Sequence, residues 1–370
     1  MIGILTLVSA DNCGSLLQAY ALQTFLRKEL HCDAELIPFA PQNARKMYRV
    51  FHPSVFKHGR SAAHFFLSLN SLFKQKSDYN AFRKCQLELP QVFCRNNRIL
   101  WDYCCRYDTI VVGSDQVWNV NMFDFDPAYF LNGFAKRKVS YAASLGGQEK
   151  EEIPAELYKY RDALNRLDSI SVREPQGKRI LERLTSSRVS VCLDPTLLLD
   201  ASIWESLAGE RIVSEDYIFF YSYNYGDPVL NQIMADCAKR LRLPVYVINA
   251  SRWIKQRPSE YGFRLCQKGG PLAFLSLMRH ARYTFAQSLH GTIFATIFKT
   301  DFWFLNGREQ DVLDQRSENI LSLLNVRHRV IRPDNVMSVD LAEPLAYHEN
   351  EQLRKLKTAS VDYLRKALAL

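Results

Sequence analysis

Short β-type runs alternate with helical patterns along most of this chain, and no other feature limits its fold more strongly. In the first half, an apolar run at residues 2–8 is followed by a loop and an amphipathic helix over residues 16–30. The other strand candidates of this half lie at residues 35–37, 109–112, 139–143, 169–172 and 189–193. Strands that alternate with helices form parallel sheets with helices on both faces. The sequence therefore predicts an α/β protein.

The second half of the chain repeats this pattern. Its strand candidates lie at residues 217–221, 245–248, 283–286 and 302–305. Its helix candidates lie at residues 230–241, 272–280 and 292–298. A chain of 370 residues exceeds the size at which one hydrophobic core usually keeps growing. We therefore expect two Rossmann-like, doubly wound domains with a central cleft.

The predicted boundaries follow from these two series of strands. The first domain covers residues 1–200 and carries an insertion at about residues 45–106. The second covers residues 210–345. A helix over residues 346–370 has no strand after it, and we expect this helix to pack back on the first domain.

The insertion at residues 45–106 is strongly basic. It contains twelve Lys and Arg residues against three Asp and Glu residues, which accounts for the whole formal net charge of +9. A basic face suits a phosphorylated substrate or an anionic lipid, and it also occurs as a solvated surface. No helix-turn-helix, RNA-recognition or zinc-finger signature accompanies the charge, so we expect no nucleic-acid partner.

One helix candidate of this insertion, residues 61–73, is a candidate for peripheral membrane contact. It carries apolar side chains between basic ones: Phe65, Phe66, Leu69, Leu72 and Phe73, flanked by Lys57, Arg60, Lys74 and Lys76. Such a helix can lie on an anionic membrane, which would bring the protein to lipid-linked sugars. Packing of the same apolar residues in the core is the alternative.

The cysteines and the apolar runs indicate the compartment. Nine cysteines include no CxxC pair, and no Cys or His spacing suits a metal, so we expect reduced thiols and no metal site. The apolar start MIGILTLVSA is short and lacks a preceding basic region, which favours a buried strand over a signal peptide. No stretch reaches the roughly 20 apolar residues of a spanning helix. We expect a cytoplasmic protein that is either soluble or peripheral at the inner face of the membrane.

Ligands of parallel sheets bind outside the carboxyl ends of the strands, so the residues that follow each strand are the site candidates. After the first strand, Asn12, Gly14 and Ser15 lead into a helix. The amino end of a helix presents free N–H groups and a positive dipole, which suit a phosphate or a carboxylate. The same residues also suit an ordinary turn with an N-cap, and both interpretations stay open.

The strand at residues 109–112 is followed by the polar run GSDQVWN. Its candidate substrate-binding residues are Ser114, Asp115, Gln116, Trp118 and Asn119. Polar groups beside an indole ring suit a sugar, whose hydroxyls need hydrogen-bond partners and whose ring face needs an aromatic plane. The alternative is a structural turn with Trp118 in the core.

Two further strand ends carry charged residues. Arg173 follows the strand at residues 169–172, and Pro175 suits the first turn of a helix, so we expect a guanidinium that is free to face the cleft. Such a guanidinium can hold a carboxylate or phosphate by two hydrogen bonds, although a lone Arg is more often an ion-pair partner. Asp194 precedes a proline at the end of the next strand, which predicts a turn cap.

The strand at residues 283–286 is followed by Ser288, His290, Gly291 and Thr292. A histidine at a strand-to-helix turn can project into the cleft, and Gly291 allows a ligand to approach the backbone closely. Histidine is also the side chain best suited to proton transfer near neutral pH. These residues are therefore candidates for catalysis and substrate binding, with His290 as the catalytic one.

Seven pieces of sequence, in order over roughly residues 1–300, resemble the polysaccharide pyruvyl transferase family. They are LLQAYALQTFL (16–26), VGSDQVWN (112–119), YAASLG (141–146), SVREP (171–175), LDPTLLL (193–199), GGPLAFL (269–275) and SLHGTIFA (288–295). The first loop reads NCGS, whereas relatives often have an aromatic residue before that glycine. The basic insertion matches least well.

The resemblance implies a glycosyltransferase-B-like pair of Rossmann-type domains, phosphoenolpyruvate as donor substrate, and a saccharide or lipid-linked oligosaccharide acceptor. It also implies that Arg173 and His290 form the donor site and that no cofactor is required. A sugar-nucleotide-dependent glycosyltransferase of the same fold is one alternative function. A non-catalytic protein that binds sugar or lipid is the other.

Overall fold

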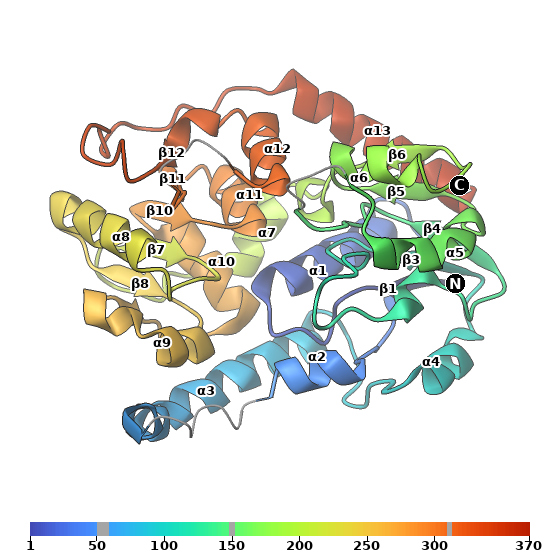
Figure 1. Ribbon diagram of the computed structural model, residues 1–370, viewed down its shortest axis with the longest axis horizontal. Coiled ribbons are helices and arrows are strands. Elements are labelled where there is room, and N and C mark those ends of the chain that lie inside the picture. Colours follow the sequence, from blue (N-terminus) through green and yellow to red (C-terminus); the bar gives the residue numbers. More distant parts are fainter. Residues whose placement is uncertain (50–58, 148–151, 309–312) are drawn as a thin grey trace.

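The computed structural model describes residues 1–49, 59–147, 152–308 and 313–370, with only the backbone described at residues 59–68. Two parallel sheets form separate halves of the molecule (Figure 1). No helix within the described ranges is long and apolar enough to span a bilayer.

The first sheet has the strand order β2-β1-β3-β4, and isolated bridges connect β4 to the pair β5-β6. Its strands are β1 (Ile2–Leu5), β2 (Ala34–Leu36), β3 (Thr109–Val112), β4 (Arg137–Ser140), β5 (Ile170–Val172) and β6 (Val189–Val191). Its helices outside the insertion are α1 (Cys13–Lys28), α5 (Arg161–Asn165) and α6 (Pro175–Leu181). The apolar runs form buried strands because helices cover both faces of a parallel sheet.

The second sheet is also parallel, with the order β12-β11-β10-β7-β8-β9. Its strands are β7 (Ile218–Tyr221), β8 (Val245–Val247), β9 (Arg264–Leu265), β10 (Tyr283–Ala286), β11 (Phe302–Leu305) and β12 (Val330–Ile331). Its helices are α8 (Pro228–Leu241), α9 (Ala250–Gln256), α10 (Gly270–His280), α11 (Leu289–Ile297) and α12 (Gln315–Leu323), and α7 (Ala201–Ala208) precedes it. The α/β class and the two doubly wound sheets agree with the prediction.

A continuous hydrophobic cluster joins the two halves. Tyr20 of α1 packs against Trp204 of α7, with ring centroids 5.7 Å apart. Trp204 in turn packs edge-on against Phe294 of α11, at 4.9 Å. Because apolar contact extends from the first sheet's helix to the second sheet's helix, the two sheets are held in a fixed relation around the cleft.

The basic insertion forms α2 (Gln42–Met47), α3 (Gly59–Cys85) and α4 (Asn97–Cys104). Arg83 of α3 donates to the carbonyl of Val8 in the first domain at 2.9 Å. Asp78 of the same helix accepts from Gly269 N of the second domain at 2.8 Å. At Gly270 φ is +71°, which strains any other residue, and a Cβ atom would lie only 3.3 Å from the backbone of α3. The helix therefore bridges the domains, and the paired glycines allow it to dock.

The final helix, α13 (Glu351–Leu368), runs from the second half to the first, where both chain termini lie (Figure 1). Tyr363 Oη donates to the carbonyl of Ser140, at the end of β4, at 2.8 Å. Ser360 Oγ accepts from Leu193 N, just beyond β6, at 2.9 Å. The helix thus contacts the first domain directly. The residue boundaries of the domains stay a prediction.

Candidate active site

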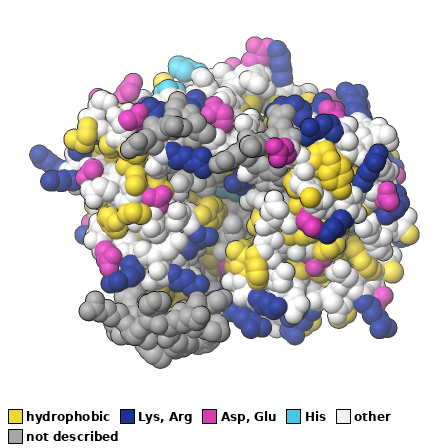
Figure 2. Space-filling model, in the orientation of Figure 1, with side chains coloured by type: hydrophobic (Ala, Val, Ile, Leu, Met, Phe, Trp, Pro, Cys, Tyr) yellow, Lys and Arg dark blue, Asp and Glu magenta, His cyan; other side chains and the backbone are white. Residues whose placement is uncertain are grey.

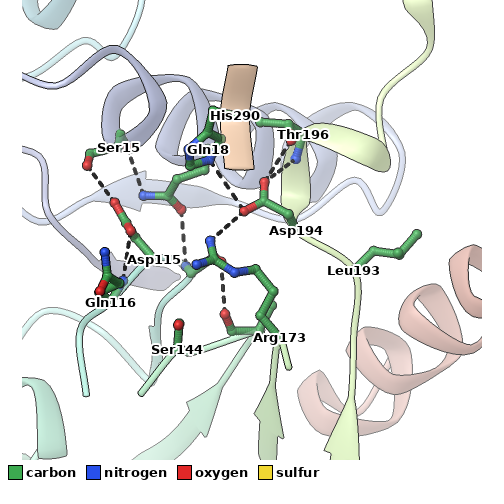
Figure 3. Close-up of polar contacts among 12 residues, drawn as sticks. Ser15, Gln18, Asp115, Gln116, Ser144, Arg173, Leu193, Asp194, Thr196 and His290 are labelled. Atoms are coloured by element: carbon green, nitrogen blue, oxygen red, sulfur yellow. Dashed lines mark hydrogen bonds and ion pairs between the residues drawn. The ribbon is translucent and has the colours of Figure 1, made fainter. Parts of the chain in front are cut away.

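Most of the predicted site residues follow β1, β3 or β10, where the strand order of each sheet reverses, whereas Arg173 follows β5. This reversal falls between β1 and β3 in the first sheet, and between β7 and β10 in the second. The loops at such points form a crevice at the carboxyl ends of the strands. Figure 3 shows Arg173 and His290 directed toward Asp194, while Asp115 nearby is directed toward Ser15 and Gln116.

Arg173 lies at the end of β5 as predicted, but its guanidinium is not free. Nε donates to Glu174 Oε1 at 2.8 Å and Nη1 donates to Asp194 Oδ2 at 2.9 Å, with 6% of the side chain exposed. Burial alone would lower the pKa of Arg173, but the carboxylates of Glu174 and Asp194 raise this pKa above its usual range. Nη2 makes no hydrogen bond to any residue that the structure describes, so one guanidinium nitrogen is left for a ligand.

Asp194 caps the turn as predicted, and it also connects the two catalytic candidates. Its Oδ1 accepts from Thr196 N at 3.1 Å and from Thr196 Oγ1 at 2.7 Å. Its Oδ2 accepts from Arg173 and lies 3.5 Å from His290 Nε2. Burial would raise the pKa of Asp194, but the nearby His290, Arg173 and Thr196 lower this pKa well below its usual range. The sequence analysis missed this second role because the side chain's partners lie far away in the chain.

His290 occupies the second position of α11 and is buried, with 9% of its side chain exposed. Its ring lies against Gly14 in the first turn of α1, where a Cβ atom would come within 2.1 Å of His290 Nδ1. Nε2 is buried and makes no hydrogen bond within the described part of the chain. The absence of a side chain at Gly14 therefore gives the imidazole its place between the domains.

This contact predicts the effect of Gly14→Ala. The helical backbone accepts alanine readily, so the cost falls on the His290 ring, which must move. We expect the turnover rate to fall by about 10²-fold, the effect of displacing a reacting group by about 1 Å. Steady-state kinetics beside a thermal unfolding curve would measure this, and full activity in a folded variant would contradict it.

The loop after β3 is connected to the start of α1. Ser15 Oγ donates to Asp115 Oδ2 at 2.5 Å, and Asp115 Oδ1 accepts from Gln116 N at 2.8 Å. Asn12 caps α1 by accepting from Ser15 N at 3.3 Å. Ser114 is fully buried, and its N and Oγ both bond within the protein, to Gln18 and Ala142. Its predicted contact with substrate is therefore wrong.

The predicted sugar-stacking role of Trp118 is also wrong. The indole is 1% exposed, its Nε1 donates to the carbonyl of Tyr129 at 3.0 Å, and its ring stacks on Phe130. Asn119 Nδ2 donates to Gln116 Oε1 at 2.9 Å and so positions Gln116. In a short loop, neighbouring side chains point alternately to the core and to the cleft. Here the indole of Trp118 points to the core.

In the loop before α11, two of the predicted ligand contacts serve the fold. Thr292 is fully buried and donates from Oγ1 to the Ser288 carbonyl at 3.1 Å. A Cβ at Gly291 would lie 2.7 Å from that of Ala286, so this glycine allows helix–strand packing rather than ligand approach. Ser288 Oγ caps α11 by accepting from Gly291 N at 3.1 Å. Of this group, His290 has a buried nitrogen, Nε2, that makes no hydrogen bond to the described residues, with Asp194 Oδ2 3.5 Å away.

A cavity of about 210 Å³ adjoins the charged cluster. Arg173, Glu174 and Asp194 line one side, and Arg316 and Asn319 of α12 line another. Arg316 Nε, Asn319 Nδ2 and Glu174 Oε2 are buried and make no hydrogen bond to the residues described. Glu174 Oε2 is an acceptor, and Arg316 Nε lies 3.4 Å from Asp314 Oδ1, so neither atom by itself indicates an anion. The buried Asn319 Nδ2, a donor without a hydrogen bond, indicates a ligand that accepts from it. The sequence analysis missed Arg316 and Asn319, because α12 lies outside the recognised motifs and was not predicted.

A second cavity, of about 480 Å³, lies between the first loop and α3 on one side and α9 on the other. Asn12 and Gln116 are the predicted site residues that line it.

All nine cysteines are free thiols. Within the described ranges, no three His, Cys, Asp or Glu side chains are grouped so that they could hold a metal ion.

Comparisons with known structures agree with this architecture. UDP-GlcNAc 2-epimerase from Neisseria meningitidis, bound to UDP-GlcNAc, is similar with a TM-score of 0.56 and 12% identity over 99% of each chain. The UDP-GlcNAc 2-epimerase from Methanocaldococcus jannaschii, in complex with UDP-GlcNAc and UDP, has a TM-score of 0.51 and 12% identity, over 98% of this chain and 99% of that one. At this identity the likeness concerns the fold alone, a glycosyltransferase-B-like pair of Rossmann-like domains.

The sequence comparisons address the family itself. A search of curated protein sequences returned no match. The sequence pattern of polysaccharide pyruvyl transferases matches residues 12–307, which include the first loop, the Arg173–Asp194–His290 cluster and α11. The chain belongs to the polysaccharide pyruvyl transferase family.

Proposed function

We propose that this protein transfers the pyruvyl group of phosphoenolpyruvate to a saccharide and forms a pyruvate ketal, in the biosynthesis of a bacterial surface polysaccharide. The observation that carries the proposal is the chain of contacts from Arg173 through Asp194 to His290. Arg173 and Asp194 line a cavity of about 210 Å³, and the imidazole of His290 lies 3.5 Å from Asp194. This volume lies below the roughly 300–1,000 Å³ of pockets for larger ligands and suits a small anionic donor.

The donor's anionic groups have candidate partners on two elements. Arg173 Nη2 makes no hydrogen bond to the described residues, and Asn319 Nδ2 is a buried neutral donor without one. Arg316 Nε also makes no hydrogen bond, although it lies 3.4 Å from the Asp314 carboxylate in an ion pair. Guanidinium groups bind carboxylates and phosphates by charge-assisted hydrogen bonds. In the proposal, these three residues hold the phosphate and the carboxylate of phosphoenolpyruvate.

The proposed reaction begins with a proton transfer from His290 to C3 of phosphoenolpyruvate. The carbon–carbon double bond is consumed, and C2 becomes oxocarbenium-like. A sugar hydroxyl adds to C2 and loses its proton, the bond from C2 to the phosphate oxygen breaks, and inorganic phosphate leaves. A second hydroxyl then adds to C2, loses its proton and closes the ketal. Asp194 orients the imidazole by its Nε2 edge.

The test uses the purified protein with phosphoenolpyruvate and acceptors that contain galactose, glucose or mannose. We expect release of inorganic phosphate that depends on the acceptor, together with the mass shift of a ketal. A protein that binds a nucleotide sugar and ignores phosphoenolpyruvate would favour a glycosyltransferase. Sugar binding without any turnover would favour a non-catalytic role.

We also propose that the basic insertion contacts an anionic membrane surface. Leu69 and Leu72 of α3 pack against Ala250 and Ile254 of α9, so these two side chains do not form a membrane face. Phe73 is half exposed. The other predicted residues of this face, Lys57, Arg60, Phe65 and Phe66, lie outside the described side chains. Lys74 is exposed, whereas Lys76 pairs with Asp11 at 2.5 Å. The proposed contact is therefore mainly electrostatic and depends on Lys74 and the other basic residues of the insertion.

This contact predicts that the protein sediments with phosphatidylserine-containing vesicles at low salt and is released at high salt. Each Lys or Arg near such a surface contributes about 1 kcal/mol, an attraction that salt screens. Vesicles of neutral lipid are the control. Failure to sediment with anionic vesicles at low salt would end the proposal.

A further inference from the structure

The cavity of about 480 Å³ is lined by a group of cations that the donor site does not use. Its charged lining residues among those described are Arg49, Lys76, Arg252, Lys255 and Asp11. Four tyrosines and several amides also line it, among them Tyr48, Tyr79, Tyr221, Tyr223, Gln75, Gln116 and Gln256. Figure 2 shows Lys and Arg side chains on both sides of the lower part of the groove between the two halves. The cavity is therefore a polar, positively charged enclosure.

Asp11 is the single acidic group among the described lining residues, and it is already neutralised. Asp11 Oδ2 accepts from Lys76 Nζ at 2.5 Å, and Asp11 Oδ1 accepts from Arg83 Nη2 at 2.7 Å. Arg252 and Lys255, one turn apart on α9, have no carboxylate partner among the residues described. Residues 50–58 contain no Asp or Glu. Two positive charges of the cavity thus lack a counter-charge among the residues that the structure describes.

The two cations of α9 also act on each other. Partial burial and the nearby Arg252 charge lower the pKa of Lys255. Two like charges at a cleft wall repel, and the repulsion is relieved when an anion binds between them. Arg252 lies over the ring of Tyr223, with its Cζ 5.1 Å from the ring centroid, and both residues line the cavity.

The first turn of α1 connects this cavity to the candidate active site. Tyr223 Oη donates to Asn12 Oδ1 at 3.1 Å, and Asn12 and Cys13 line the cavity. The next residue, Gly14, contacts the His290 ring. A molecule in the large cavity therefore lies beside the same helical turn as the proposed general acid.

We infer that Arg252 and Lys255 form a binding site for the phosphate groups of the acceptor, which is therefore a diphosphate-linked sugar. The inference rests on the proposed function and names the class of its acceptor. The donor has arginines of its own in the smaller cavity, so the phosphate held by α9 belongs to the other substrate. The larger volume has room for a diphosphate and an attached sugar, since ligand pockets range over roughly 300–1,000 Å³.

The experiment measures binding of inorganic pyrophosphate by titration calorimetry at low salt, without acceptor or donor. We expect Arg252→Gln and Lys255→Gln each to weaken pyrophosphate binding about tenfold, because each removes a charge-assisted hydrogen bond. Binding of phosphoenolpyruvate should not change. Lys28→Gln, an exposed lysine at the opposite end of α1, is the matched control and should bind pyrophosphate as the wild type does. Circular dichroism establishes that each variant is folded.

Three results would overturn the inference. The first is that the wild type fails to bind pyrophosphate. The second is that both α9 variants bind pyrophosphate as tightly as the wild type. The third is that the variants lose phosphoenolpyruvate binding, which would make this cavity the donor site. If phosphoenolpyruvate does not bind the wild type while pyrophosphate binding still depends on Arg252 and Lys255, the phosphate site stands and the donor proposal fails.

Two further binding measurements distinguish whether the diphosphate of the acceptor is attached to a nucleoside or to a lipid. UDP and farnesyl diphosphate carry the same diphosphate on a nucleoside and on a lipid. Tighter binding of UDP would assign a nucleotide-linked acceptor, and tighter binding of farnesyl diphosphate a lipid-linked one. Either result supports a diphosphate site, provided that binding weakens in Arg252→Gln.

Discussion

Replacement of His290 by alanine is expected to reduce phosphoenolpyruvate-dependent transfer by about 10²–10⁴-fold, the contribution of one well-placed proton transfer. The expectation depends on geometry: the ring is buried between Gly14 and Asp194, and its Nε2 makes no hydrogen bond within the described residues. A group that acts in the chemical step changes kcat more than the apparent affinity for the donor. We therefore expect kcat to fall and KM for phosphoenolpyruvate to change little.

The control for this variant is His290→Gln, which keeps a polar side chain of similar size but cannot exchange a proton near neutral pH. It should fold as the wild type does and lose activity to the same degree as His290→Ala. If His290→Gln is active while His290→Ala is not, the ring has a packing role. If both variants turn over at the wild-type rate, His290 has no part in the mechanism.

Replacement of Asp194 by asparagine is expected to destabilise the fold by about 3–5 kcal/mol, because it removes the carboxylate from a buried ion pair. Asparagine can keep the turn cap to Thr196, but it leaves Arg173 and His290 without their shared counter-charge. The position of the imidazole is then no longer fixed, so transfer should fall as well. Urea unfolding and steady-state kinetics measure the two effects.

The pH dependence of stability follows from the same carboxylate. The pKa of Asp194 is lowered in the folded protein, so its contribution to stability is complete above the unfolded value of about 3.9 and is lost as the pH falls below it. The free energy of unfolding should therefore differ most between wild type and Asp194→Asn at neutral pH. The difference should shrink when both are measured near pH 3.

The matched control is Asp200→Asn, whose carboxylate is 84% exposed and lies 3.7 Å from Lys357. An exposed ion pair contributes at most about 1 kcal/mol, so this variant should resemble the wild type at both pH values. An Asp194→Asn protein as stable and active as the Asp200→Asn protein would contradict the role assigned to the buried cluster.

Much of the fold could be predicted because buried parallel strands have a local signature. The strands at Thr109–Val112, Tyr283–Ala286 and Phe302–Leu305 have the predicted bounds. The elements that the sequence did not predict have a weak local pattern. The two-residue strands β9 and β12 are too short to show a period, and α12 was not predicted. Helix α3 extends to Cys85, beyond the predicted end at residue 73, because its later turns are held by contacts to both domains.

The sequence predicted where the residues of the candidate site lie, but it predicted the roles of only some of them. Arg173 and His290 lie at strand ends near each other, as the rule for parallel sheets requires. Asp194, expected only to cap a turn, links them. Trp118, expected at a sugar, is in the core.

The sequence by itself determined the α/β class, the two series of strands, the family and the loops that carry polar groups, because strand and helix periods are properties of neighbouring residues. Only the tertiary structure decided which charges meet. It paired Arg173 with two carboxylates, set His290 against Gly14, and left Arg252 and Lys255 without a counter-charge among the described residues. The free energy of a charge depends on the few ångströms around it, and those distances are set by elements that are far apart in the chain.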